Sequence, residues 1–365
     1  MNLIIPPTMK RIVIEAYAIT TPYVGVGEFC KRLGEGLANQ AVRLREHYEI
    51  EFYFIVPPSY RGCFGNEVHY ICMPVFMRHL LTFYPFKTDL FHMPHQYCLF
   101  KNLRHVTKRL MTIHDINFIY EKQGKKLERG IQRFQQKIKR MDYTNYISEF
   151  VRKDTNKHFH IRVPERVIYN GVSALSVPSE ISPRLVQQLP DSFLFHLSSL
   201  LPKKNVHLLI EMMRFLPEQN LVIAGNWNSS YGKMLQKMID ELPTRNVYRL
   251  PNVTEEEKAY LYASCRAFLY PSLCEGFGLP PIEAMKFGKP VFLSALTSLP
   301  EVGGEHAFYW NELSPETMAE KIKEMLPVFY THPDYALQMK QNAERFNWNN
   351  CVNQYIQYYL EILAS

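Results

Sequence analysis

The sequence predicts an α/β protein of two Rossmann-like domains that face one another across a cleft, and three observations predict it. Short β-branched or aromatic runs alternate with helical stretches, and this alternation occurs twice along the chain. The length of 365 residues suits two domains of ~150 residues each. The apolar pattern lapses between Gly171 and Asp191, which indicates a linker. Strands joined through helices need right-handed crossovers and form parallel sheets.

In the first half of the chain, a long helix is expected from Gly27 to Arg45, since Phe29, Leu33, Leu37 and Val42 lie near helical spacing. A second helix, rich in basic residues, is expected between Glu121 and Arg140. The expected strands are Arg11–Tyr17, Glu51–Val56, Leu90–His92, Leu110–Ile113, Tyr143–Ile147 and Arg166–Tyr169.

The second half repeats the pattern, and its helix starting after Thr254 carries a capping box with Glu257 at the third helical position. The expected strands are Phe193–Leu197, Leu221–Ala224, Val247–Leu250, Ala267–Tyr270 and Pro290–Leu293. The expected helices are Asn205–Leu216, Tyr231–Glu241, Thr254–Ser264 and Pro281–Phe287, and a last one runs from Trp348 to Leu363. The predicted domains are therefore residues 1–175 and 190–346, followed by a terminal helix in 347–365.

Composition excludes several classes of protein. A hydrophobic fraction of 47% and a charged fraction of 21% are ordinary for a globular enzyme and exclude a largely disordered chain. No apolar run reaches ~18 residues, and the first residues lack the pattern of a secretory signal. The 7 cysteines are scattered without C-x-x-C spacing, which disfavours a zinc ribbon or a disulfide framework. These features predict a cytoplasmic protein.

The formal net charge of +7 is unevenly placed. Residues 1–180 hold 26 Lys+Arg against 16 Asp+Glu, and the remainder holds 16 against 19. A basic half suits anionic partners such as phosphates or acidic lipids, although a solvated surface explains it equally well.

The most informative segment is a predicted strand–turn–helix corner that runs from Tyr270 to Val291. Gly276 and Gly278 lie in the turn, and a proline pair opens the helix. Backbone amides at such a turn approach a ligand closely, and a helix N-terminus favours an anion such as a diphosphate. Glu275 precedes the helix and Glu283 is expected in its first turn, where carboxylates accept hydrogen bonds from hydroxyls. Gly-rich corners are common, so this pattern alone leaves a purely structural turn possible.

The whole corner resembles the E-x7-E signature of retaining glycosyltransferases of the GT-B fold, family 4, with Glu275 and Glu283 as its two acids. The matching residues include Pro271-Ser272, Glu275-Gly276-Phe277-Gly278-Leu279, Glu283-Ala284-Met285, Gly288-Lys289-Pro290-Val291 and Leu299-Pro300-Glu301-Val302-Gly303-Gly304. The resemblance implies that Glu275, Gly276, Phe277, Gly278 and Leu279 bind the donor. It also implies a GT-B fold, whose terminal helix crosses back to the N-terminal domain.

Other segments resemble the family in the same order. The run around Gly25 and Gly27 resembles an N-terminal Gly-rich loop at the sugar or diphosphate, and it matches neither a P-loop nor a dinucleotide fingerprint. Thr112-Ile113-His114-Asp115 resembles the H-D element, which implies that His114 lies near the transferred sugar. Tyr146-Ile147-Ser148-Glu149 and Asn170-Gly171-Val172 resemble elements that are expected to be structural.

One position departs from the family pattern. The family usually places an Arg five residues before a Lys, and both hold the donor diphosphate. Here Lys204 fits the Lys position, whereas Ser199 stands at the Arg position. A strong bidentate partner of the diphosphate is therefore missing, and Lys203 is a candidate replacement.

The resemblance implies transfer of a hexosyl group from a UDP- or GDP-sugar to an acceptor hydroxyl, with retention, in the synthesis of a cell-surface polysaccharide or lipopolysaccharide-type glycan. Glu275, His114 and Lys204 are the expected catalytic residues. Glu283 is expected to bind the ribose, and the nucleobase is expected near Asn252 and Val253. No D-x-D occurs in the sequence, so we expect neither a metal nor another cofactor.

The sequence does not identify the acceptor, but a basic stretch of the N-terminal domain suggests where it binds. On a helix, this stretch suits an anionic membrane surface and a lipid-linked acceptor, although a solvated helix packed on the sheet is the somewhat more favoured alternative. Its basic residues are Lys122, Lys125, Lys126, Arg129, Arg133, Lys137, Lys139 and Arg140. Peripheral attachment to the inner face of a membrane would follow from the first interpretation.

Three other functions compete with a retaining glycosyltransferase. Another GT-B enzyme, such as an epimerase or an inverting transferase, would lack the block around Glu275. A catalytically impaired nucleotide-sugar-binding protein is favoured by Ser199. A nucleic-acid binder is permitted by the basic half of the chain, but no recognised motif supports it.

Overall fold

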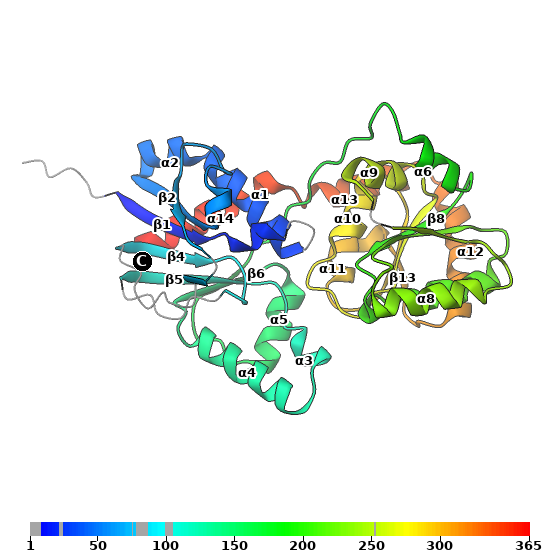
Figure 1. The fold of residues 1–365 in the computed structure, drawn as a ribbon, viewed down its shortest axis with the longest axis horizontal. Helices are drawn as coiled ribbons and strands as arrows, with labels where there is room; N and C mark the ends of the chain where they lie inside the picture. The colour runs from blue at the N-terminus through cyan, green and yellow to red at the C-terminus, as the bar shows by residue number, and fades with distance from the viewer. Residues whose placement is uncertain (1–8, 22–24, 75, 78–86, 99–104, 252) are drawn as a thin grey trace, which may run out of the picture. The chain divides into compact units, whose positions relative to one another are not determined.

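The computed structural model describes residues 9–21, 25–74, 76–77, 87–98, 105–251 and 253–365. The chain divides into two compact units: residues 1–171 together with 347–365, and residues 172–346. Each unit contains a sheet whose described strand pairs are all parallel. The predicted α/β class with two Rossmann-like domains is therefore confirmed (Figure 1).

The amino-terminal unit has a seven-stranded sheet in the order β3-β2-β1-β4-β5-β6-β7. The chain order reverses between β1 and β4, and in such sheets ligands bind at the carboxyl ends of the strands beside the reversal. The strands are β1 Lys10–Glu15, β2 Ile50–Val56, β3 His69–Cys72, β4 Thr88–Met93, β5 Val106–Ile113, β6 Tyr143–Tyr146 and β7 Glu165–Val167.

The carboxy-terminal unit has a six-stranded sheet in the order β10-β9-β8-β11-β12-β13. Here the order reverses between β8 and β11. The strands are β8 Leu194–Ser198, β9 Leu221–Gly225, β10 Val247–Leu250, β11 Ala267–Tyr270, β12 Val291–Ser294 and β13 Phe308–Trp310. The four strands β8, β9, β11 and β12 read as continuous apolar runs because helices cover both faces of a parallel sheet.

Helices connect the strands in both units. Those of the amino-terminal unit are α1 Gly25–Asn39, α2 Ala41–Tyr48, α3 Phe118–Glu121, α4 Gly124–Ile138, α5 Glu149–His158 and α14 Trp348–Ala364. Those of the carboxy-terminal unit are α6 Pro183–Gln188, α7 Val206–Met212, α8 Ser230–Asp240, α9 Glu255–Ser264, α10 Leu279–Lys286, α11 Leu299–Gly303, α12 Pro315–Thr331 and α13 Tyr335–Glu344. The capping box at Thr254 and Glu257 is confirmed, with both reciprocal hydrogen bonds present.

The last helix, α14, belongs to the amino-terminal unit, where it packs against α1 and β4. A buried polar network fastens it to the sheet. The Nδ1 atom of His92 lies 2.7 Å from the hydroxyl of Tyr359, and its Nε2 lies 2.8 Å from the hydroxyl of Thr112. The amide of Asn145 donates to the hydroxyl of Tyr355 at 2.7 Å. Burial lowers the pKa of His92 to about 3, so its ring is neutral in this network.

Several element boundaries differ from the sequence expectations. The helix expected over Gly27–Arg45 is two helices, because the N–H of Gln40 bonds to the carbonyl of Leu37, three residues back, and this tight turn ends α1. The short helix α6 lies inside the expected linker. The sequence does not predict the edge strands β3 and β13.

The basic helix α4 packs its apolar side within the unit. Phe134 contacts Phe118 and Phe159, with ring centroids 5.8 and 4.6 Å apart. Lys137 donates to the backbone carbonyls of Gln96 and Cys98 at 2.6 Å, so it is a structural residue rather than part of a charged surface. Among the described residues, no helix combines the length and the apolar character needed to span a membrane.

Candidate active site

Two charged side chains meet where the strand order of the carboxy-terminal sheet reverses. Lys204 ends the 3-10 turn Pro202–Lys204 that follows β8, and Glu275 lies in the segment that follows β11. β8 and β11 are neighbours with the reversal between them. The topology therefore brings these two residues to the edge of the sheet at which ligands of doubly wound folds bind.

Lys204 and Glu275 form an ion pair. The Nζ atom of Lys204 lies 2.5 Å from Oε1 of Glu275 and donates a second hydrogen bond to the hydroxyl of Tyr270 at 2.9 Å. The side chains of Lys204 and Glu275 are only 11% and 12% exposed, so solvent screens the pair weakly. The sequence-predicted catalytic pair is thus brought into direct contact.

The charge state of Glu275 results from opposing effects. Burial alone would raise the pKa of its carboxyl group. The charge and hydrogen bond of Lys204, together with hydrogen bonds from Ser272 and Tyr270, outweigh burial and lower the pKa below its ordinary value. The site therefore holds a carboxylate that stays ionised in a poorly solvated position.

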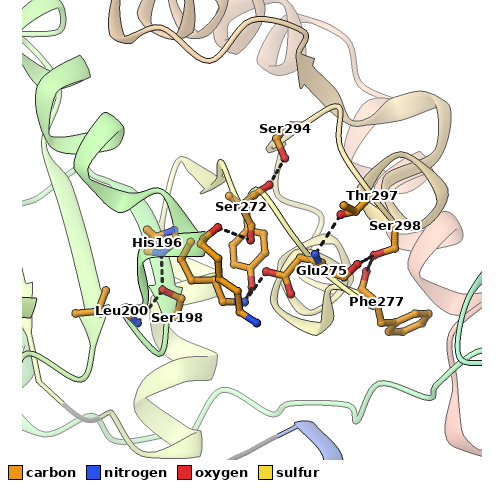
Figure 2. Close-up of polar contacts among 12 residues, drawn as sticks. His196, Ser198, Leu200, Ser272, Glu275, Phe277, Ser294, Thr297 and Ser298 are labelled. Carbon is orange, nitrogen blue, oxygen red and sulfur yellow. Dashed lines mark hydrogen bonds and ion pairs between the residues drawn. The ribbon is translucent and has the colours of Figure 1, made fainter. Parts of the chain in front are cut away.

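Hydrogen bonds from two neighbouring segments fix the loop that carries Glu275. The N–H of Glu275 donates to the hydroxyl of Thr297 at 3.1 Å, and Ser298 donates to the carbonyls of Glu275 and Phe277 at 3.2 and 2.8 Å. Figure 2 shows Thr297 and Ser298 beside Glu275. On the other side, the N–H of Leu273 donates to the carbonyl of Lys203 at 2.8 Å, which ties the loop to the Lys204 turn.

Glu283 is held by two partners from α9. Its Oε1 lies 3.1 Å from Nζ of Lys258, and its Oε2 accepts a hydrogen bond from Tyr262 at 2.9 Å. Because α10 begins at Leu279, Glu283 is in the second turn of the helix, and the expectation that it lies in the first turn is wrong. The helix starts earlier than expected because Gly278, at φ 110°, ends the loop in a left-handed conformation.

The start of α10 offers fewer amide donors than an ordinary helix. Pro280 and Pro281 carry no amide proton, so the N–H groups at this turn belong to Gly276, Phe277, Gly278 and Leu279. The side chain of Phe277 is buried against Phe346, with ring centroids 5.4 Å apart. Any donor contact of Phe277 is therefore one of its backbone.

Ser199, at the position where the family has an Arg, is exposed in the loop after β8. Its neighbour Ser198 accepts the N–H of Leu200 at 3.3 Å and lies 2.9 Å from Nε2 of His196. Burial lowers the pKa of His196 to about 4, so this ring is a neutral support below the site. Val253 is partly buried in the segment between β10 and α9, and Asn252 lies outside the described residues.

The glycines expected in an amino-terminal loop lie instead in the first turn of α1. Gly25 is its first residue and Gly27 its third. A Cβ atom on Gly27 would lie 2.0 Å from the carbonyl oxygen of Thr21 and 2.7 Å from that of Ala18. Gly27 is therefore required for α1 to pack on the preceding 3-10 turn Tyr17–Thr20, which is a structural reason for this glycine.

His114 follows β5 in the amino-terminal unit and is buried. Its Nε2 lies 2.8 Å from the carbonyl of Pro94, and the ring of Phe29 packs edge-on at 4.8 Å. Burial lowers the pKa of His114 to about 3, so the ring is neutral and its Nε2 carries the proton that faces Pro94. The Nδ1 atom is thereby left as a hydrogen-bond acceptor.

Sequence reasoning missed the groups that hold the acids in place, namely Tyr270, Lys258 and Tyr262. The sequence pattern places Tyr270 only at the end of a strand, and Lys258 and Tyr262 only within a helix. Their spacing of four residues places Lys258 and Tyr262 on one helical face, which is the signal available in the sequence. Within the described residues, no cluster of three or more His, Cys, Asp or Glu side chains is arranged to hold a metal ion.

Comparison with known proteins identifies the carboxy-terminal unit. Residues 179–346 match the family model described as Glycosyl transferases group 1. The O-antigen chain mannosyltransferase B of Escherichia coli is 28% identical over 228 residues, which cover 58% of this chain and 59% of that protein. The chain thus aligns with little more than half the length of this relative.

Two solved structures share the architecture. Sucrose-phosphate synthase from Thermosynechococcus elongatus has a TM-score of 0.76 at 17% identity, covering 97% of this chain and 99% of that chain. HepE of Anabaena, in complex with UDP and glucose, has a TM-score of 0.72 at 17% identity, covering 96% and 99%. The chain therefore has the GT-B fold, and the resemblance to group 1 glycosyltransferases is confirmed for the unit that holds Lys204 and Glu275.

Proposed function

We propose that the protein is a retaining glycosyltransferase that moves a hexosyl group from a UDP- or GDP-sugar to a hydroxyl of an acceptor glycan. The observation that carries the proposal is the Lys204–Glu275 pair at the strand reversal of a group 1 unit. The name of the Escherichia coli relative supports a hexosyl group and the synthesis of a cell-surface polysaccharide. The HepE complex with UDP and glucose supports a nucleoside-diphosphate donor.

The chemistry requires stabilisation of a departing diphosphate. The bond between the anomeric carbon and the diphosphate oxygen breaks. The acceptor oxygen then bonds to the anomeric carbon from the face of the sugar that the diphosphate leaves. The acceptor proton passes to the departing diphosphate. Lys204 supplies a fixed positive charge to this leaving group, while the carboxylate of Glu275 accepts hydrogen bonds from sugar hydroxyls. Glu283 is proposed to accept hydrogen bonds from the ribose.

The charge balance of the acids supports transfer without a metal ion. Glu275, the acid expected beside the donor sugar, is neutralised by Lys204 at 2.5 Å. A divalent cation beside a diphosphate needs carboxylates whose charge is uncompensated. We therefore expect activity to persist in EDTA.

The neutral His114 supports a contact to the sugar or the acceptor. Because its Nε2 proton faces the carbonyl of Pro94, only Nδ1 is left to accept a hydrogen bond from a hydroxyl. This role is that of a positioning group, since a ring with a pKa of about 3 does not take up a second proton at neutral pH and so cannot act as a general base.

The exposed side of α4 supports peripheral binding to an anionic membrane. Its apolar side is occupied by Phe118 and Phe159, so the attraction would be electrostatic rather than insertion. The exposed basic residues on α4 and directly beside it in the chain are Lys122, Lys125, Lys126, Arg129, Arg133, Lys139 and Arg140. Binding to vesicles with phosphatidylserine at low salt, lost when Lys125, Lys126 and Arg129 are changed to Gln, is the expected result. Equal binding by the triple variant would contradict it.

A second candidate function is nucleotide-sugar binding without catalysis. The exposed Ser199 favours it, because one cation of the usual pair on the diphosphate is missing. Incubation with UDP- and GDP-hexoses and glycan acceptors, followed by mass spectrometry of the products, separates the two functions. Transfer supports the enzyme, whereas binding of a donor without any product supports the second candidate.

A further inference from the structure

Tyr270 contributes the third polar group of the Lys204–Glu275 site. It is the last residue of β11, its side chain is 1% exposed, and its hydroxyl accepts a hydrogen bond from Nζ of Lys204 at 2.9 Å. A hydroxyl that accepts a hydrogen bond keeps its own proton for donation. The same Nζ atom of Lys204 lies 2.5 Å from Oε1 of Glu275. The three groups form a triangle in which Lys204 bonds to both the phenol and the carboxylate.

The ring of Tyr270 is held rigidly from below. His196 stacks on it at 5.6 Å with an interplanar angle of 26°, and Phe268 stacks at 5.8 Å and 24°. His196 is fixed in turn by the carbonyl of Leu269 at 2.7 Å and the hydroxyl of Ser198 at 2.9 Å. Lys204, by contrast, carries its charge on a flexible four-carbon chain. The phenol is the fixed point of the triangle.

We propose that Tyr270 is a positioning residue that holds the Lys204 ammonium beside Glu275 while a donor diphosphate competes for the lysine. This inference rests on the proposed function. An arriving diphosphate draws the ammonium away from Glu275, while the hydrogen bond to the phenol oxygen keeps it at the site. The phenol oxygen also limits how far the ammonium moves. With Ser199 in place of an Arg, Lys204 bears more of the diphosphate charge, so its placement matters more.

The groups that face Glu275 are few, which makes the effect of the phenol measurable. Lys204, Tyr270 and Ser272 all lower the pKa of this carboxyl group, against burial, which raises it. Burial lowers the pKa of His196 to about 4, although the charge of Glu275 opposes this shift. The His196 ring is therefore neutral and adds no positive charge beside Glu275. The charge of Glu283 raises the pKa of Tyr270 and is not among the causes that shift the pKa of Glu275. Removal of the phenol oxygen therefore raises the pKa of Glu275.

The test is the variant Tyr270→Phe, with Tyr309→Phe as the matched control. The hydroxyl of Tyr309, in the same unit, donates to the backbone carbonyl of Gly304 at 2.6 Å rather than to Lys204 or Glu275. For Tyr270→Phe, we expect kcat/KM to fall on the order of tenfold, as for loss of a hydrogen bond to a charged group. We also expect the acid limb of its pH–rate profile to move to higher pH. The control should leave both unchanged.

A second measurement does not depend on activity. The difference in melting temperature between wild type and Tyr270→Phe should shrink as the pH falls through the carboxyl range, because protonated Glu275 no longer attracts the ammonium that the phenol holds. In a Glu275→Gln background, the same substitution should lose this pH dependence. The inference is overturned if a folded Tyr270→Phe variant keeps the wild-type acid limb and shows the same pH dependence in both backgrounds. Absence of transfer by the wild type would instead refute the proposed function. It would leave the comparison of melting temperatures in the two backgrounds valid.

Discussion

Nζ of Lys204 lies 2.5 Å from Oε1 of Glu275, although 71 residues separate the two in the sequence. They meet because β8 and β11 are adjacent strands, so the segments that follow them share one edge of the sheet. A buried ion pair of this kind adds little to stability, since desolvation offsets most of the attraction. Its placement at the strand reversal therefore points to chemistry.

Removing the charge of Glu275 should stop transfer while the fold persists. In Glu275→Gln, the amide retains the shape of the side chain but loses the ionic partner of Lys204. We expect kcat to fall by on the order of a hundredfold or more, as for loss of a preorganised electrostatic contact. Steady-state kinetics check this, with the exposed Glu241→Gln as control. A Glu275→Gln variant with wild-type kcat would refute the assignment.

Restoring an arginine at position 199 should strengthen donor binding. Ser199 is exposed after β8, so Ser199→Arg fits without displacing the core. A guanidinium beside Lys204 binds a diphosphate in bidentate fashion, and the dissociation constant of the nucleoside diphosphate is expected to fall several-fold. Calorimetric titration measures it, and Ser230→Arg, in the first turn of α8, tests for a general charge effect. Equal affinities of wild type and Ser199→Arg would show that the diphosphate binds elsewhere.

The attachment of α14 should depend on the tyrosine hydroxyls that reach the sheet. Tyr359→Phe leaves Nδ1 of the buried His92 without its partner at 2.7 Å. A loss of about 1–3 kcal/mol in the free energy of unfolding is expected. Urea denaturation measures this loss, and Tyr330→Phe, whose hydroxyl contacts a carbonyl at an exposed position, should cost less. Equal costs for the two variants would contradict a network that fastens α14.

Stability should fall in mild acid because three buried histidines are neutral. Burial lowers the pKa to about 3 for His92 and His114 and to about 4 for His196, against an ordinary value of 6.5. Between these values the unfolded chain binds protons that the folded chain does not. The free energy of unfolding therefore declines as the pH falls below about 6.5, by up to about 1.4 kcal/mol per pH unit for each ring.

Denaturant unfolding between pH 7 and pH 4 measures that slope. His92→Asn should lower this slope by up to about 1.4 kcal/mol per pH unit, the contribution of one proton. The exposed His47→Gln should leave the slope unchanged. An unaltered slope in His92→Asn would mean that this ring is not buried in its neutral form.

Strongly patterned segments were predictable from the sequence, and short or half-exposed ones were not. The apolar runs around Leu221 and Phe268 predicted central strands because both faces of a parallel sheet are covered. The strand β3 lies at a sheet edge and none of its four residues is fully buried, so it lacks the apolar run that marks a central strand. The split at Gln40 leaves the helical apolar spacing intact, so no pattern marked it.

The motif residues of the site were predictable, but their supporting partners were not. The family resemblance predicted Glu275, Lys204 and Glu283 because their spacing matches the family pattern. Tyr270 and Lys258 reach them from other strands and helices, and such contacts depend on topology rather than on local sequence. The structural role of Gly27 was hidden for the same reason, because the carbonyls that exclude a Cβ come from a separate turn.

The most direct test of the central assignment is a thermal-shift measurement in EDTA, with wild type and Lys204→Met side by side. Both proteins are titrated with UDP, GDP and their hexose conjugates, since a ligand that binds the folded state raises its melting temperature by mass action. We expect one base to raise the melting temperature of the wild type and to have a much smaller effect on Lys204→Met. Equal shifts for both proteins, or none with any nucleotide, would contradict a donor diphosphate held at Lys204 and Glu275.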